Sequence, residues 1–132
     1  MKGKYLLDTN ILVAYLEGEH QVVETFKQLE KECHISVVSV SELMFGAYKS
    51  KSWMKNLERY ADFLSGLSIL AVNTDIAETN GLVKAVLKEQ GITLTDNDLW
   101  IASTAVYYRL TLVTRDQDFQ RIKNFQLNIE MW

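Results

Sequence analysis

The stretch Lys4–Leu12, KYLLDTNIL, joins two kinds of apolar pattern through a single carboxylate. KYLL is typical of a short buried strand, and the residues after Asp8 change to helical spacing that stops at Gly18. A strand that passes directly into a helix is typical of α/β proteins. Burying a carboxylate at the end of a core strand costs free energy, so Asp8 needs a partner that offsets this cost.

The rest of the chain repeats the alternation of strand and helix. Further strands are expected at 33–38, 68–72 and 111–114, and the residues 125–130 are compatible with an edge strand. Helices are expected at 21–32, 39–50, 53–67, 75–91 and 96–110, with a helical turn at 116–122. This pattern predicts an α/β fold with a mainly parallel sheet of four or five strands and helices on both faces.

Composition indicates one compact, intracellular domain spanning 1–132. The 132 residues are 48% hydrophobic and contain no proline, and we find no linker or repeat. No apolar run approaches the ~20 residues that cross a bilayer, and no signal-like segment is present, so we expect a cytoplasmic protein with no membrane partner. The single Cys33 cannot form an intrachain disulfide and is expected to be a small buried residue.

Four carboxylates follow or lie near the expected strand ends. Asp8 follows the first strand, Glu42 lies in the first turn of the helix after the second, and Asp116 follows the fourth strand by two residues. Asp98 lies in the first turn of the most apolar helix. Because the carboxyl ends of parallel strands meet at one edge of a sheet, we expect these four acids to converge there.

Each acid also has a purely structural explanation when it is taken alone. Asp8 would cap the next helix by accepting from the amide of Asn10 or Ile11, and Asp116 would initiate a turn. The pairs Ser39–Glu42 and Thr95–Asp98 have the spacing of a capping box. Capping accounts for each acid separately but not for their convergence, and the two roles are compatible.

Converging carboxylates would repel one another unless a cation lies between them. A ligand set made only of carboxylates favours a hard ion, Mg²⁺ or Mn²⁺, over zinc. Such an ion binds phosphate oxygens readily and supports hydrolysis of phosphoesters. The net charge of −3 provides no global attraction for a polyanion, so nucleic acid would need local cations or bound metal. This reasoning leaves a phosphodiesterase and a phosphatase equally open.

Four stretches resemble a known family. YLLDTNILVAYL at 5–16, ISVVSVSELMFGAYKS at 35–50, DNDLWIASTAVYYRLTLVTRDQDFQRI at 96–122 and IEMW at 129–132 are similar to the PIN-domain ribonucleases, and among them to VapC-type toxins of prokaryotic toxin-antitoxin pairs. Their order and spacing span nearly the whole chain. The resemblance implies a PIN-like three-layer sandwich.

The resemblance also implies roles for individual residues. Asp8, Glu42 and Asp98 match the metal-binding acids of the family, and Asp116 matches a fourth, more variable acid, with Asp118 as the alternative. Thr114 matches a hydroxyl at the last strand end that orients a carboxylate or a water. The remaining candidates around the metal are Asp96 and Asp118, which lie off the family pattern, and Asn10, which is expected to hydrogen-bond within the first loop or to form an Asx-turn. TDND replaces the glycine- or proline-containing segment that usually precedes the acid at 98.

The family further implies endonucleolytic cleavage of RNA with Mg²⁺ (or Mn²⁺), a homodimer, and a small cognate antitoxin protein that blocks the site. Two alternatives stay open: a metal-binding PIN-fold module without turnover, and a metal-dependent phosphatase or nuclease acting on another phosphoester. A receiver domain is disfavoured because no aspartate lies between Asp8 and Asp62. A haloacid-dehalogenase-like phosphatase is disfavoured because Asn10 stands where its second aspartate would be.

Local cations are the candidates for RNA contact. Lys49, Lys51 and Lys55 surround the break between two expected helices, and Arg115 lies beside Asp116. Phosphate contacts of this kind would position an RNA strand without reading its sequence. A lysine run at a helix end is more often simply solvated, and Tyr48 and Trp53 more often pack than stack on a base.

Overall fold

The computed structural model describes residues 3–132, which form a five-stranded parallel sheet with helices on both faces. The strands are β1 (Tyr5–Leu7), β2 (Cys33–Ser36), β3 (Ser68–Leu70), β4 (Thr111–Val113) and β5 (Ile129–Glu130). Their spatial order is β3-β2-β1-β4-β5, and every adjacent pair is parallel. β1 is therefore the central strand, with the second half of the chain returning to its other side.

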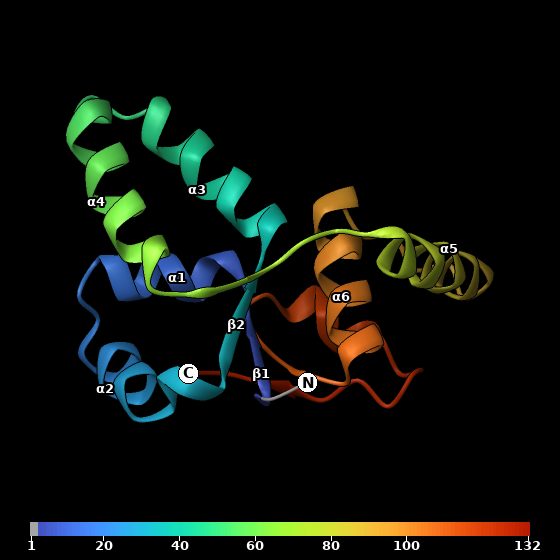
Figure 1. The fold of residues 1–132 in the computed structure, drawn as a ribbon. Helices are drawn as coiled ribbons and strands as arrows, with labels where there is room; N and C mark the ends of the chain where they lie inside the picture. The colour runs from blue at the N-terminus through green and yellow to red at the C-terminus, as the bar shows by residue number, and fades with distance from the viewer. Residues whose placement is uncertain (1–2) are drawn as a thin grey trace.

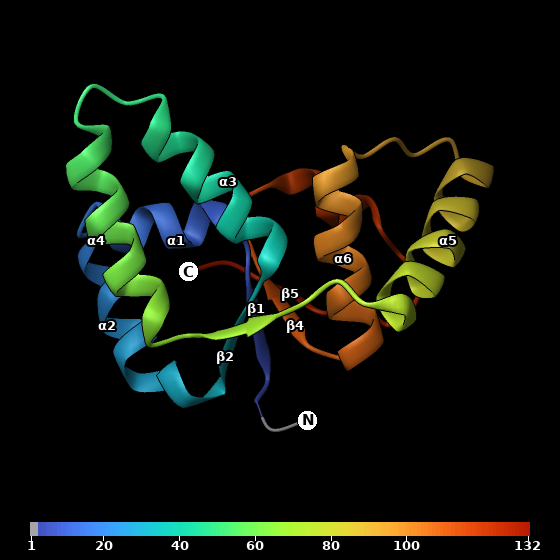
Figure 2. The same ribbon diagram turned by 45° about the horizontal axis from the view of Figure 1, so that its top comes forward.

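Six helices cover the two faces of the sheet. They are α1 (Thr9–Leu16), α2 (His20–Leu29), α3 (Val37–Tyr48), α4 (Trp53–Ser65), α5 (Thr74–Glu89) and α6 (Asp96–Tyr108), with short 3₁₀ turns η1 (Glu30–Glu32) and η2 (Gln117–Arg121). Helices α1 to α4 lie on one side of the strands, and α5 and α6 lie on the other (Figures 1 and 2). The predicted three-layer α/β sandwich is confirmed.

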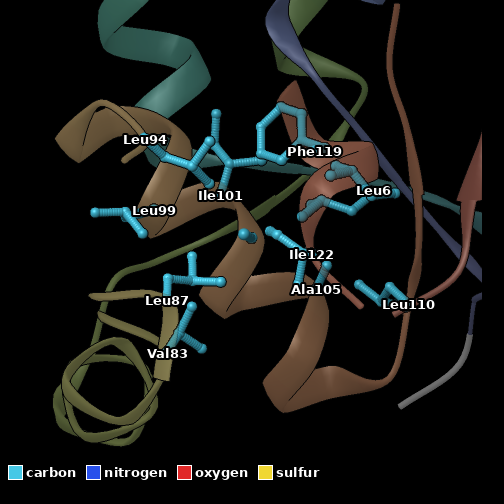
Figure 3. Packing of buried hydrophobic residues seen from close by; sticks show 12 residues of the cluster. Leu6, Val83, Leu87, Leu94, Leu99, Ile101, Ala105, Leu110, Phe119 and Ile122 are labelled. Carbon is cyan, nitrogen blue, oxygen red and sulfur yellow. The ribbon is translucent and has the colours of Figure 1, made fainter. Parts of the chain in front are cut away.

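Alternating side chains of the central strands build one core on each face. Leu6 of β1 packs with the α5–α6 side, and its neighbour Leu7 packs with the side of α1 to α4. Leu112 and Val113 of β4 divide in the same way, and all four side chains are almost fully buried. Successive side chains of a strand point to opposite faces, so a short run of leucine and valine anchors both layers. Figure 3 shows the α5–α6 core, in which Phe119 of η2 packs near Ile101 and Leu6.

Several strands are shorter than the sequence pattern predicts. The strand expected at 33–38 ends at Ser36, because the Ser36 side chain accepts a hydrogen bond from the Val38 amide at 3.1 Å and caps α3. The edge strand compatible with 125–130 is reduced to Ile129–Glu130, since Phe125 and Gln126 have φ angles of 66° and 54°. A left-handed backbone of this kind cannot continue a strand. The strand expected at 68–72 ends at Leu70.

Two smaller expectations are also tested. Cys33 is buried with a free thiol, as predicted. Within residues 3–132, none of the helices has the length and apolar character needed to cross a membrane.

Candidate active site

Asp8 lies where the central strand meets its first helix. Its side chain is 5% exposed and caps α1, with Oδ1 accepting from the Thr9 amide at 2.8 Å. The expected amide donors, Asn10 and Ile11, are therefore replaced by Thr9. Oδ2 accepts from the Thr114 hydroxyl at 2.7 Å, across the strand pair β1–β4. These two hydrogen bonds are the partners that offset part of the cost of burying this carboxylate.

Glu42 reaches the same region from the second turn of α3. The Thr9 hydroxyl donates to Glu42 Oε1 at 2.7 Å and lies 2.9 Å from Ser39 Oγ. The predicted capping box of Ser39 and Glu42 is wrong, because α3 starts at Val37 and Ser36 is its cap. Ser39 is instead fully buried beside Thr9. Glu42 is thus free of a capping role and is oriented by a hydroxyl from the first helix.

Asp98 enters from the other layer, on the first turn of α6. Thr95 caps this helix, as the sequence predicts, and its hydroxyl oxygen accepts from the Asp98 amide at 3.2 Å. The carboxylate of Asp98 is half-buried and lines a pocket with Asp8. Asp96, expected near the metal, instead forms an ion pair with Lys84 at 3.8 Å and does not line that pocket.

The segment after β4 supplies the fourth acid. The Asp116 amide donates to Thr114 Oγ1 at 3.0 Å, and Asp116 Oδ1 accepts from the Asp118 amide at 2.9 Å, which forms the predicted turn. Asp116 lines the pocket, whereas Asp118 is exposed outside it. Asn10 bridges to this segment: its Nδ2 lies 3.4 Å from Thr114 Oγ1, and its Oδ1 accepts from the Arg115 amide. The expected hydrogen bond of Asn10 within the first loop is therefore wrong.

All four predicted acids line one pocket of about 460 Å³, together with Thr9, Asn10, Glu19 and Arg115. A larger cavity of about 760 Å³ lies between the end of α6 and residues 125–128, but Arg109 is its one ionisable lining residue. The smaller pocket is the candidate site, because several carboxylates face it, whereas no carboxylate is among the lining residues of the larger cavity.

The pKa shifts show that these acids influence one another. The pKa of Asp8 is raised to about 6, chiefly by burial; the hydrogen bonds from Thr114 and Thr9 lower it, and the charges of Asp98 and Glu42 raise it. Burial also raises the pKa of Asp98, with contributions from the charges of Asp116, Glu42 and Asp118 and an opposing hydrogen bond involving Thr95. These acids come from segments far apart in sequence, and they lie close enough together for their charges to repel one another.

Comparison with known proteins agrees with this geometry. The PIN domain family model matches residues 5–124. The chain belongs to the PIN-domain family. It is 34% identical over 131 residues to ribonuclease VapC2 of Haemophilus influenzae, with 98% of each chain covered. It is 30% identical to the tRNA(fMet)-specific endonuclease VapC of Salmonella typhimurium, again with 98% of each covered. The crystal structure of DNA-bound VapBC from Salmonella typhimurium superposes with a TM-score of 0.92 at 30% identity, covering 98% of both chains.

This PIN domain therefore groups with the VapC ribonucleases, and the predicted class of enzyme, a nuclease of toxin type, is confirmed. The first three of the four quoted stretches lie within the matched region. The sequence resemblance rested on those stretches, and the matched region 5–124 includes all four acids.

The donor set of this PIN domain fits a hard divalent cation. Apart from Arg115, the ionisable residues that line the pocket are aspartates and glutamates, which offer oxygen ligands. Repulsion among these carboxylates falls when a cation lies between them. Among residues 3–132, no three Asp, Glu, His or Cys side chains are already closed around a single point. Mg²⁺ does not require such a cage, since it keeps several waters and is bound through one or two carboxylates.

The predicted cations of this PIN domain lie in two different environments. Arg115 lines the pocket but is engaged, since its guanidinium donates to Glu19, with Nη1 3.2 Å from Oε1, and to the Trp132 carbonyl at 3.3 Å. This pairing raises the pKa of Arg115 and lowers that of Glu19. Lys49 and Lys51 are exposed at the far end of α3 and in the turn that follows.

The sequence does not indicate several residues of the site, among them Glu17, which also lines the pocket. Thr9, which orients Glu42, stands next to Asp8 in the quoted DTN, so its position was a usable signal. Its spacing to Glu42 suggests Ser39 only as a cap, although it lies against Thr9. Glu19 pairs with Arg115 across 96 residues, and no local pattern indicates it.

Proposed function

We propose that this VapC-type PIN domain holds Mg²⁺ or Mn²⁺ among Asp8, Glu42, Asp98 and Asp116 and hydrolyses internal phosphodiester bonds of RNA. The observation that carries the proposal is that carboxylates from β1, α3, α6 and the end of β4 line one pocket. Asp116 is the fourth acid in this proposal, rather than Asp118, because Asp116 faces the pocket and Asp118 does not.

When bound, the ion would supply Lewis acidity toward the phosphate and make water a stronger nucleophile near neutral pH. The chain's own residues set the direction of its ligands. Thr114 and the Thr9 amide hold the two oxygens of Asp8, and the Thr9 hydroxyl holds Glu42. Each ionised carboxylate oxygen keeps further lone pairs, so these hydrogen bonds leave capacity for a cation.

The hydroxyl groups of Thr9 and Thr114 hold the carboxylates in position by hydrogen bonds. Thr9 and Thr114 add no charge to a pocket that is already rich in carboxylates, and Asn10 links Thr114 to the backbone of Arg115. The first helix and the end of β4 are thereby tied together around Asp8. A fixed frame of this kind supports catalysis because the ligands need not reorganise when substrate binds.

The proposed setting is that of a toxin-antitoxin pair in the cytoplasm. The predicted partners are RNA as substrate, a small cognate antitoxin protein and a second copy of the chain. The structural similarity to VapBC supports an antitoxin partner. An acidic pocket with Arg115 at its edge favours an inhibitor that brings its own cations to the carboxylates.

The test is cleavage of total RNA by the purified protein with Mg²⁺ or with chelator, followed by mapping of the new ends. We expect discrete internal cuts that depend on the metal. Asp98→Asn removes a pocket carboxylate and should lower the rate by about 100-fold or more. Asp96→Asn is the matched control, since it lies two residues away and pairs with Lys84 outside the pocket. Equal activity of the Asp98 variant, or metal-independent cleavage, would refute the proposal.

A further inference from the structure

One face of α3 continues outward from Glu42. Residues three, four and seven positions apart lie on the same side of a helix, so Phe45 and Lys49 share the face that carries Glu42. Leu43 and Ala47 lie on the opposite side and are buried. α3 runs away from the end of β2 toward the turn that joins it to α4 (Figure 2), so this face leads from the pocket toward that turn.

Phe45 and Lys49 form a paired aromatic and cationic surface on that face. The Phe45 side chain is 67% exposed, and the Lys49 ammonium lies 5.1 Å from the centre of its ring, in a cation–π arrangement. Neither residue belongs to either buried cluster. Tyr48 and Trp53, by contrast, stack on each other, with ring centres 6.2 Å apart. Phe45 is not stacked on another ring, so its largely exposed side chain offers a flat ligand the ring face that lies away from Lys49.

Charge changes sign along the same path. The pocket is lined by carboxylates, whereas between Glu42 and Glu58 the chain carries Lys49, Lys51 and Lys55 and no acidic residue. An RNA strand whose scissile phosphate lies at the acids has its neighbouring phosphates repelled by them. Cations farther along α3 would offset that repulsion, and an exposed aromatic ring offers a stacking surface for an unpaired base.

We propose that Phe45 and Lys49 form a subsite for the nucleotide beside the scissile phosphate, with Phe45 stacked on an unpaired base and Lys49 paired with a phosphate. This inference rests on the proposed function and specifies single-stranded RNA as the form of substrate at this position. Stacking of this kind tolerates any base, because every base has a π face, so the subsite adds affinity rather than sequence preference. The continuity of the face with Glu42 and the reversal of charge favour RNA over an apolar protein segment as its occupant.

The experiment measures binding of a fluorescein-labelled single-stranded RNA in Mg²⁺, in an Asp98→Asn background that prevents cleavage, together with KM and kcat in the active protein. Phe45→Ala should weaken binding about tenfold, the effect of losing one base–aromatic stack, and Phe45→Trp should retain it. Lys49→Gln should reduce the salt dependence of binding by about one released ion. In the active protein, KM should rise while kcat changes little.

Matched controls come from α5. Leu82 is 57% exposed, and Lys88 is an exposed lysine of the same helix, so Leu82→Ala and Lys88→Gln remove comparable groups away from α3. Neither should alter RNA binding. Unchanged affinity of Phe45→Ala would overturn the subsite, as would a lower sedimenting mass of that variant, which would assign Phe45 to contact between copies. Failure of the unsubstituted protein to cleave any RNA would instead refute the proposed function itself.

Discussion

Asp8 is a carboxylate with both oxygens hydrogen-bonded and almost no exposure to solvent. The bonds from Thr9 and Thr114 favour its ionised form, but burial outweighs them, and the nearby acids add to the effect, so its pKa rises from 3.8 to about 6. The metal-free protein is therefore destabilised by this residue at neutral pH. The same carboxylate is among those that line the pocket.

The first prediction concerns the stability of Asp8→Asn in chelator. A raised pKa means that the folded state favours the protonated acid, so its stabilising contribution is complete below pH 3.8 and is lost as pH rises toward 6. Above pH 6 the substitution should raise the free energy of unfolding by about 1–2 kcal/mol. The difference should vanish near pH 4. Chemical denaturation of both proteins between pH 4 and 8 measures it, and a less stable variant at pH 7.5 would contradict it.

Residues of the site differ in how far the sequence reveals them. Asp8, Glu42, Asp98 and Asp116 follow apolar runs that mark strand ends and helix starts, so their gathering was predictable from local pattern and parallel topology. The hydrogen-bond partner of Asn10 was not predictable from local pattern, because Thr114 lies 104 residues away and the β1–β4 pairing brings the two together. Hydrogen bonds between distant loops leave no periodic signal in sequence.

At the scale of elements, α3 shows where local pattern misplaces a boundary. Val37 and Val38 extend the apolar run of β2 and have high strand propensity, so the run predicts a strand to residue 38. The structure instead ends β2 at Ser36, which caps the helix. Both Ser36 and Ser39 are acceptable caps by residue type, but Ser36 accepts from the Val38 amide, whereas Ser39 is buried beside Thr9.

The second prediction tests that cap. Ser36→Ala removes the acceptor for the partly buried Val38 amide, so the free energy of unfolding should fall by about 1 kcal/mol. Ser41→Ala is the control, since Ser41 is exposed in the same helix and alanine favours helix there. Urea denaturation of the two variants distinguishes them. Equal stability of both would place the helix start elsewhere.

At the scale of the molecule, the central position of β1 makes the site possible. The chain builds β2 and β3 on one side of β1 and then crosses to place β4 and β5 on the other. The acid at the end of β1 thus lies between those carried by α3 and by the segment after β4, while α6 supplies Asp98 from the opposite layer. Alternating strands and helices predict a parallel sheet, but several strand orders satisfy that pattern. The order β3-β2-β1-β4-β5 therefore could not be predicted from the sequence and is given by the structure.

The third prediction follows from this long-range assembly. Because the four acids meet only when β1, β4, α3 and α6 are in place, a divalent cation that they bind should stabilise the folded protein. Mg²⁺ at about ten times its Kd should add about 1.4 kcal/mol and raise Tm by about 5 °C relative to chelator at pH 7.5. The double variant Asp8→Asn/Asp98→Asn should lose this shift, whereas Glu89→Gln, an exposed acid on α5, should keep it. Thermal unfolding of the three proteins with Mg²⁺ and with chelator checks it, and a full shift in the double variant would place the cation at other carboxylates.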